Sequence, residues 1–192
     1  MSTINYKFTL TGDTETGKEC FFKKLRRFNE KSISTIGIDR TTINLNLEVC
    51  DKEGKIEKKE FCITFSNIGG QEKFLSIACS NIKESIGIFI VYNITIRETF
   101  ERVESLIEHI KEIRGNNDKS RYVIVLIGNN LDLVEENSEK RDVDEDEAIQ
   151  MCEEYDMIWG GEQSFAKLNY HGCIELLRKY TGEIYKKLGK KN

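Results

Sequence analysis

The segment Gly12–Lys18 constrains this chain more than any other stretch, because it reads G-D-T-E-T-G-K and so has the spacing G-x-x-x-x-G-K. A short β-prone run, Tyr6–Leu10, precedes it, and the stretch from Gly17 to Phe28 has apolar residues near helical spacing. In such a strand–loop–helix unit, backbone N–H groups and the positive end of the helix dipole face a common anion. The segment therefore predicts a phosphate-binding loop in which Lys18 reaches the outer phosphates.

The residue after this lysine departs from the pattern. A phosphate-binding loop normally has serine or threonine there, and the hydroxyl coordinates Mg²⁺. This chain has Glu19 instead, followed by Cys20. Any function that uses a bound phosphate must therefore accommodate a carboxylate beside the metal position.

Composition limits the classes of protein that fit. A chain of 192 residues with 32% charged residues is expected to form one domain, 1–192, with a short basic tail at 186–192. The net charge of −4 argues against general nucleic-acid binding. The longest apolar run, Ile86–Tyr92, is too short to span a bilayer, and no signal peptide is expected. The six cysteines include no C-x-x-C pair, so a zinc site is not expected.

Strand-like and helix-like segments alternate along the chain, separated by the loops Asn29–Arg40 and Ser66–Phe74. This order predicts an α/β fold, with a mostly parallel sheet of about six strands, one antiparallel hairpin at its edge and helices on both faces. The expected strands are Tyr6–Leu10, Thr41–Val49, Ile56–Phe65, Ile86–Tyr92, Tyr122–Ile127 and Met157–Trp159. The expected helices are 17–28, 75–84, Ile96–Ile113, one that begins in the charged run Glu135–Glu147, and Asn169–Leu188.

Six segments, taken in order, point to one protein family. They are Gly12–Cys20, Ser34–Asp39, Gly70–Phe74, Val91–Thr95 with Glu98–Phe100, Gly128–Asp132 and Ser164–Lys167. They resemble, in that order, the G-D-S-G-x-G-K-S-C, S-T-I-G-V-D, G-Q-E-R-F, V-Y-D-V-T…E-S-F, G-N-K-x-D and S-A-K motifs of the Rab branch of the Ras superfamily of small GTPases. The resemblance covers nearly all of the chain from residue 6 to about residue 185, and it implies a P-loop G domain that binds GTP and GDP.

The resemblance assigns the guanine base to two loops. Asp132 would accept hydrogen bonds from the ring N1–H and the exocyclic amine of guanine, while Asn129 buttresses its loop. Ala166 would present its backbone N–H to the guanine oxygen, and Lys167 would lie along the base. The plainer alternative is that Asn129–Asp132 is only a polar turn after a strand, and the phosphate-binding loop argues against it.

Two residues of these loops differ from the family pattern. Asn130 replaces a lysine whose aliphatic stem covers the base, and Phe165 intrudes in the last motif, where its ring would restore some stacking on the base. The expected nucleotide-binding residues are Glu15, Thr16, Gly17, Lys18, Glu19, Cys20, Phe28, Thr35, Gly70, Asn129, Asn130, Asp132, Ser164, Phe165, Ala166 and Lys167.

Hydrolysis of GTP requires that a water molecule be positioned and that charge on the transferred phosphoryl group be stabilised. The resemblance makes Gln71 the catalytic residue that orients this water. The backbone N–H of Gly70 would sense the γ-phosphate, and Thr35 would close the first switch through its hydroxyl on Mg²⁺ and its N–H on the γ-phosphate. No arginine of the motifs is placed to complete the charge stabilisation, so a GTPase-activating protein is expected to supply one.

Departures from the family cluster around the metal, for which Glu19 and Thr35 are the candidate ligands. Asn67 replaces an aspartate that normally holds a Mg²⁺-bound water, and the first switch is short. Glu19 would repel the phosphates, since two like charges 4 Å apart cost about 4 kcal/mol at an effective dielectric near 20. Alternatively, Glu19 is itself a metal ligand, and its negative charge replaces the one that is lost because Asn67 stands in place of an aspartate. We favour weakened Mg²⁺ binding, because octahedral Mg²⁺ tolerates misplaced ligands poorly.

The sequence thus predicts a Rab-like guanine-nucleotide switch with slow GTP hydrolysis, acting in the cytoplasm and reaching endomembranes through its partners. The resemblance implies an effector, an exchange factor and a GTPase-activating protein. No lipid anchor is expected, because the last cysteine, Cys173, falls inside a predicted helix. The chief alternative is a pseudo-GTPase scaffold with little or no hydrolysis. A small P-loop kinase is a weaker one, because it leaves the guanine-loop motifs unexplained.

Overall fold

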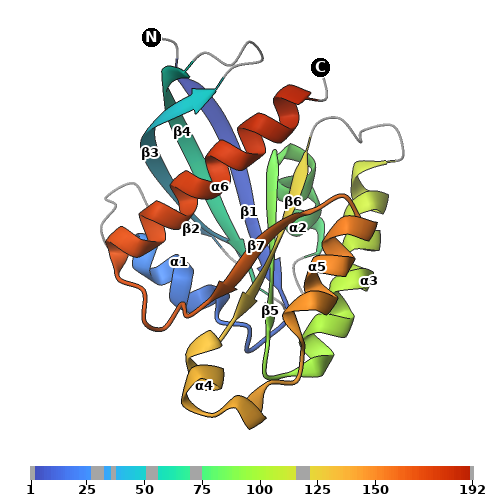
Figure 1. Cartoon of the computed structure of the whole chain (residues 1–192). Helices are drawn as coiled ribbons and strands as arrows, with labels where there is room; N and C mark the ends of the chain where they lie inside the picture. Colours follow the sequence, from blue (N-terminus) through green and yellow to red (C-terminus); the bar gives the residue numbers. More distant parts are fainter. Residues whose placement is uncertain are drawn as a thin grey trace.

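A computed structural model describes residues 3–26, 33–35, 38–50, 56–69, 75–115 and 122–190 (Figure 1). At its centre is a seven-stranded sheet in the order β2-β3-β4-β1-β5-β6-β7. The strands are β1 (Ile4–Gly12), β2 (Ile33–Thr35), β3 (Ile38–Cys50), β4 (Ile56–Ile68), β5 (Gly87–Asn93), β6 (Val123–Asn129) and β7 (Ile158–Gln163). The helices are α1 (Lys18–Arg26), α2 (Leu75–Glu84), α3 (Arg97–Arg114), α4 (Leu131–Glu136), the 3-10 turn η2 (Ser138–Lys140), α5 (Glu145–Glu154) and α6 (Tyr170–Lys190). None of the helices in these ranges is long and apolar enough to cross a membrane.

The sheet has the mixed topology that the sequence predicts. Strands β4, β1, β5, β6 and β7 pair in parallel, with β1 between β4 and β5. Strand β3 pairs antiparallel with β4, from Ile38 opposite Ile68 to Cys50 opposite Ile56, which is the expected hairpin. Parallel neighbours must be joined by crossovers, and these place helices on both faces. The predicted α/β fold is confirmed.

Two short elements go beyond the prediction. Strand β2 lies within the expected loop Asn29–Arg40 and pairs antiparallel with the start of β3, where Thr35 is opposite Ile38. It adds a seventh strand to the six expected. Helix α4 follows directly on the segment assigned to the guanine base. Neither element is long enough to show a strand or helix period in its sequence, so both depend on their surroundings.

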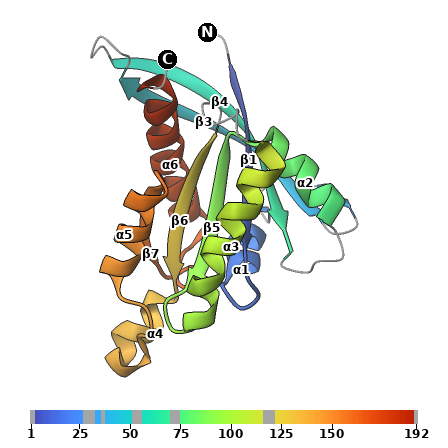
Figure 2. The same cartoon turned by 90° about the vertical axis from the view of Figure 1, so that its right-hand side faces the viewer.

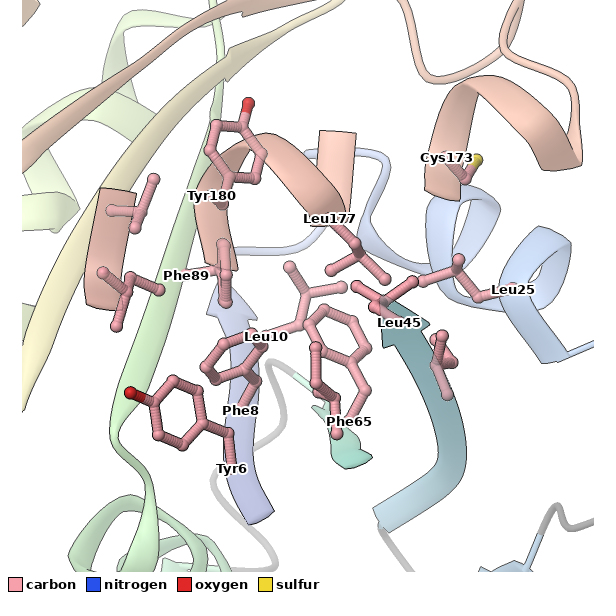
Figure 3. Close-up of a cluster of buried hydrophobic side chains, with 14 of the residues drawn as sticks. Tyr6, Phe8, Leu10, Leu25, Leu45, Phe65, Phe89, Cys173, Leu177 and Tyr180 are labelled. Carbon is pink, nitrogen blue, oxygen red and sulfur yellow. The ribbon is translucent and has the colours of Figure 1, made fainter. Parts of the chain in front are cut away.

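Helices α1 and α6 cover one face of the sheet over an aromatic core (Figure 3). Strand β1 directs Tyr6, Phe8 and Leu10 to this face, because alternate residues of a strand point the same way. The rings of Phe8 and Phe89 lie 5.2 Å apart at an interplanar angle of 64°, an edge-to-face contact. Each ring buried in this way stabilises the fold by about 1.5–3 kcal/mol.

Helices α2, α3 and α5 cover the opposite face (Figure 2). Strand β5 is fully buried and sends Ile88 and Ile90 toward α3 while Phe89 faces the aromatic core. The continuous apolar run in the sequence reflects this burial on both sides. Because the parallel strands share one direction, their carboxyl ends meet at a single edge of the sheet, where the loops that carry the sequence motifs begin.

Candidate functional site

Three loops leave the carboxyl ends of β1, β6 and β7, near the starts of α1 and α4 at the lower end of Figure 1. Residues 13–17 join β1 to α1, residue 130 joins β6 to α4, and residues 164–169 join β7 to α6. This edge is where open α/β sheets bind ligands. The sequence motifs for phosphate and base therefore lie on the same edge of the sheet.

The backbone of the first loop requires glycine at two positions. Gly12 has φ of +142°, and a Cβ there would lie 2.2 Å from the carbonyl oxygen of Val91. Gly17 has φ of +84°, and its Cβ would lie 2.1 Å from Nδ2 of Asn129. Both distances are shorter than any real contact, so no side chain fits. Glu15 also adopts a positive φ, of 60°, which is strained for a residue other than glycine.

Lys18 lies under this loop and is only 5% exposed. Its ammonium donates hydrogen bonds to the backbone oxygen of Asp13 and, at 3.2 Å, to Oγ1 of Thr16. Burial lowers the pKa of Lys18 to about 8, and the carboxylates of Glu19 and Asp13 oppose the shift. The site thus contains a poorly solvated cation, which an anionic group such as a phosphate would stabilise.

Asn129 joins the three loops. Its Nδ2 donates to the backbone oxygen of Thr16 at 2.9 Å and to Oδ1 of Asn130 at 2.8 Å. Its Oδ1 accepts from the backbone N–H of Phe165 at 2.9 Å. Asn129 is 2% exposed, and both of its amide hydrogens and its amide oxygen are bonded inside the protein. The buttressing contact that the resemblance implies is therefore present, and it fixes the distance between the phosphate loop and both base loops.

Asn93 is a second connection to the phosphate loop, and sequence reasoning assigned it no role. Its Nδ2 donates to the backbone oxygen of Glu15 at 3.2 Å, while its Oδ1 accepts from the N–H of Thr95 at 3.0 Å. Asn93 is the last residue of β5 and is 3% exposed. Asn93 lies inside the motif Val91–Thr95, so its place in that motif could have marked it as a candidate site residue.

The residues expected around the base occupy the two remaining loops. Asn130 has φ of 75° in the left-handed region, a conformation that asparagine tolerates better than most residues, and directly precedes α4. Asp132 is in the first turn of α4 and is half-buried. Ala166 and Lys167 are exposed, and the ammonium of Lys167 lies 3.8 Å from a carboxylate oxygen of Glu136. The backbone oxygen of Ser164 accepts from Lys167 N–H at 2.9 Å, which closes a tight turn.

Phe165 corrects one expectation. Its ring is 1% exposed and stacks on Phe21 of α1, with ring centroids 4.6 Å apart and an interplanar angle of 25°. The ring belongs to the aromatic core under the loop, so the prediction that it restores stacking on the base is wrong. The apolar ring gains more from the core than from a half-open base site. Only the backbone of Phe165 contributes to the loop.

Glu19 and Asn67 are in direct contact. Nδ2 of Asn67 donates to Oε1 of Glu19 at 2.6 Å, although the residues are 48 positions apart. Asn67 is near the end of β4 and is 3% exposed, whereas Glu19 is exposed in the first turn of α1. Oδ1 of Asn67 is buried without a hydrogen-bond partner among the described residues. The two residues that depart from the family pattern near the metal position, Glu19 and Asn67, are thus hydrogen-bonded to each other.

This pair does not fit the Mg²⁺ site of the family. The two positions that would supply a hydroxyl and a water-holding carboxylate instead bond to each other, through an amide N–H donor and a carboxylate oxygen. An amide N–H repels a cation, and the bonded carboxylate would have to release it to become a ligand. Nowhere in the described ranges do three or more His, Cys, Asp or Glu side chains form a metal-binding group.

Some expected site residues lie outside the described residues. They are Phe28, Gly70 and the predicted catalytic residue Gln71. The backbone of Thr35 is described, in β2 beside Ile38. The remaining predicted residues lie on the three loops or in the first turn of the adjoining helix, except Asn129, which is the last residue of β6.

Comparisons with known proteins agree with this geometry. The model of the Ras family matches residues 7–178. Ras-related protein Rab-13 of Canis lupus familiaris is 32% identical over 152 residues, covering 78% of this chain and 66% of that protein. Ras-related protein Rab-4 of Dictyostelium discoideum is 28% identical, with 95% and 80% covered. Ras-related protein RABA4b of Arabidopsis thaliana is 28% identical, with 97% and 75% covered.

Proposed function

Because this chain belongs to the Ras family and resembles its Rab proteins, we propose that it is a guanine-nucleotide switch acting in intracellular membrane trafficking. The observation that carries the proposal is the bonding of Asn129. One buried side chain sets the spacing between the phosphate loop, at Thr16, and the base loop, at Phe165. A ligand that touches both loops must span this fixed separation, as the phosphates and base of a nucleotide do.

The phosphates bind at the first loop. Lys18 supplies the cation, and the unpaired N–H groups of the first turn of α1 supply donors. Helix α1 begins with bonds from Cys20 N–H and Phe21 N–H to the oxygen of Gly17, so the donors before them are available to an anion. The acidic residues Asp13, Glu15 and Glu19 lie on or directly after the same loop and weaken its attraction for phosphate, although a guanidinium nitrogen of Arg102 lies 2.9 Å from the carboxylate of Asp13.

The guanine base is read by Asp132 and the backbone of Ala166. A carboxylate accepts from both N1–H and the 2-amino group of guanine, a pair of donors that adenine lacks. Changing Asp132→Asn should reverse part of this preference, because an amide donor suits xanthine, whose 2-position is a carbonyl. We expect GDP binding to weaken at least 100-fold, or about 2.7 kcal/mol, and xanthosine diphosphate to become the better ligand.

Titration calorimetry with GDP, xanthosine diphosphate and ADP measures this change. The wild-type protein should bind GDP and neither of the others. Equal binding of ADP and GDP by the wild-type protein would reject the guanine assignment and revive the P-loop kinase alternative.

We propose further that Mg²⁺ binds weakly at this site. Glu19 places a carboxylate near the phosphates, and its hydrogen bond to Asn67 competes with any metal. Hydrolysis is then slow. Gln71 orients the attacking water and Gly70 senses the γ-phosphate, while a GTPase-activating protein supplies the missing arginine.

The second candidate function is a pseudo-GTPase scaffold, and the same Glu19–Asn67 bond favours it. In that case the protein binds partners in one conformation and does not hydrolyse GTP. Single-turnover hydrolysis of radiolabelled GTP distinguishes the two functions. Slow release of phosphate that Gln71→Leu abolishes supports the switch, and no release above the rate in buffer supports the scaffold.

A further inference from the structure

Helix α1 holds the base loop through one lysine. The ammonium of Lys24 donates to the backbone oxygen of Phe165 at 2.5 Å and to that of Ala166 at 2.8 Å. Lys24 is half-buried, one turn after Cys20, whose sulfur approaches the same oxygen of Phe165 at 3.6 Å. Both hydrogen bonds are charge-assisted and short, so they are stronger than neutral ones.

These bonds determine where one backbone donor points. The peptide unit between Phe165 and Ala166 comprises the oxygen of Phe165 and the N–H of Ala166, and it is trans. In a planar trans peptide the C=O and N–H groups point in opposite directions. Because Lys24 draws the oxygen toward α1, the N–H of Ala166 points away from the helix. A cation on the oxygen also polarises the peptide and makes the N–H a better donor.

We propose that Lys24 is a positioning residue for base recognition, which orients and strengthens the Ala166 N–H so that it selects purines with an oxygen at position 6. This inference rests on the proposed nucleotide function, in which that N–H contacts the guanine oxygen. Lys24 does not touch the nucleotide. It acts only through the peptide unit that it fixes.

Other contacts also hold the loop in place, since the N–H groups of Lys167 and Leu168 donate to the oxygen of Ser164 at 2.9 and 3.1 Å and close a turn around this peptide unit. The N–H of Phe165 bonds to Oδ1 of Asn129, and its ring stacks on Phe21. Loss of the ammonium therefore leaves the turn closed and the loop attached at Phe165, but it removes the charged donor from the Phe165 oxygen, so that the Ala166 N–H becomes a weaker and less closely oriented donor. The effect of Lys24 should be confined to the position-6 oxygen of the ligand, and this separates positioning from general loosening.

The test compares Lys24→Met with Lys23→Met, which removes an exposed lysine from the adjacent position of the same helix. Two ligands are titrated by calorimetry: GDP, and 2-aminopurine riboside diphosphate, which lacks the 6-oxygen and also the N1–H that donates to Asp132, so each variant is compared with the wild type for the same ligand. Lys24→Met should weaken GDP binding about tenfold and change binding of the analogue less than about twofold. Lys23→Met should leave both affinities unchanged. Lys24→Arg should restore GDP binding, since a guanidinium can also donate to both oxygens.

An equal loss for GDP and the analogue, or no loss for either, would overturn the role of Lys24. Failure of the wild-type protein to bind GDP would overturn the proposed function together with this inference, and so is a distinct result. If Lys24→Met does not yield folded protein, Lys24→Gln removes the charge at similar length. It should show the same selective loss of GDP binding.

Discussion

Replacing Glu19 with serine should tighten Mg²⁺-dependent binding of GDP. The change removes a carboxylate from the first turn of α1 and breaks its 2.6 Å hydrogen bond to Asn67. It also places a hydroxyl where the phosphate-binding loop normally has one. If the carboxylate is a repulsive substitute for this hydroxyl, removing it should strengthen both metal and nucleotide binding.

The magnitude follows from the position of the carboxylate. Two full charges 4 Å apart repel by about 4 kcal/mol at an effective dielectric near 20. Glu19 is exposed to water and accepts a hydrogen bond from the amide of Asn67, and both effects reduce the repulsion energy. We expect a gain of about 1–2 kcal/mol, which is roughly 5- to 30-fold in the dissociation constant.

The assay is the fluorescence of a labelled GDP, titrated with protein in excess Mg²⁺ and again in EDTA. The affinity for GDP in Mg²⁺ divided by the affinity in EDTA should be small for the wild-type protein. This ratio should rise at least fivefold in Glu19→Ser, as the expected gain of about 1–2 kcal/mol implies. Glu139→Ser, which removes an exposed carboxylate on η2, should leave the ratio unchanged.

Asn67→Asp completes a double-mutant cycle. Alone it places two carboxylates in contact, so it should weaken Mg²⁺-dependent binding or unfold the site. In Glu19→Ser/Asn67→Asp the two effects should be strongly non-additive, because the double variant restores a hydroxyl and a carboxylate. If Glu19→Ser does not tighten Mg²⁺-dependent binding, the repulsion argument is wrong and Glu19 acts as a ligand.

Two further predictions concern Lys18 and Phe165. Burial lowers the pKa of Lys18 to about 8, so the free protein loses this positive charge above pH 8. Between pH 7 and 9, GDP binding should therefore weaken about tenfold more in the wild type than in Lys18→Arg, whose guanidinium stays charged. Titrations at each pH check this, and equal slopes would contradict it. Phe165→Ala should lower the free energy of unfolding by about 3 kcal/mol, measured by urea denaturation, since the ring is 1% exposed on Phe21. A loss under about 1 kcal/mol would mean that the ring is not part of the core.

The sequence predicted the fold well because its signals are local. The run Ile86–Tyr92 is apolar throughout, and the strand there is buried on both faces. The hairpin alternates, and its strands have one buried face along most of their length. Strand β2 was missed because three residues show no period, and its pairing with β3 is a tertiary contact.

The site was predicted less completely, because its contacts join distant residues. The motifs drew attention to Asn129, but its three bonding partners appear only in the fold. The contacts of Lys24 likewise appear only in the fold, because they join residues 141 and 142 positions apart in the sequence. Phe165 was assigned to the base because it interrupts a polar motif, whereas burial beside Phe21 determines its position. Sequence spacing does not show which side of a loop faces the core.

The identity of the nucleotide carried by the purified protein tests the proposed switch most directly. Protein prepared once in Mg²⁺ and once in EDTA is denatured, and the released nucleotide is identified and quantified by anion-exchange chromatography. A guanine nucleotide should be present in both preparations, in amounts that EDTA lowers only slightly if, as proposed, the Glu19–Asn67 pair weakens the metal's contribution. No guanine nucleotide in either preparation, or adenine nucleotide in its place, would contradict a guanine-nucleotide switch.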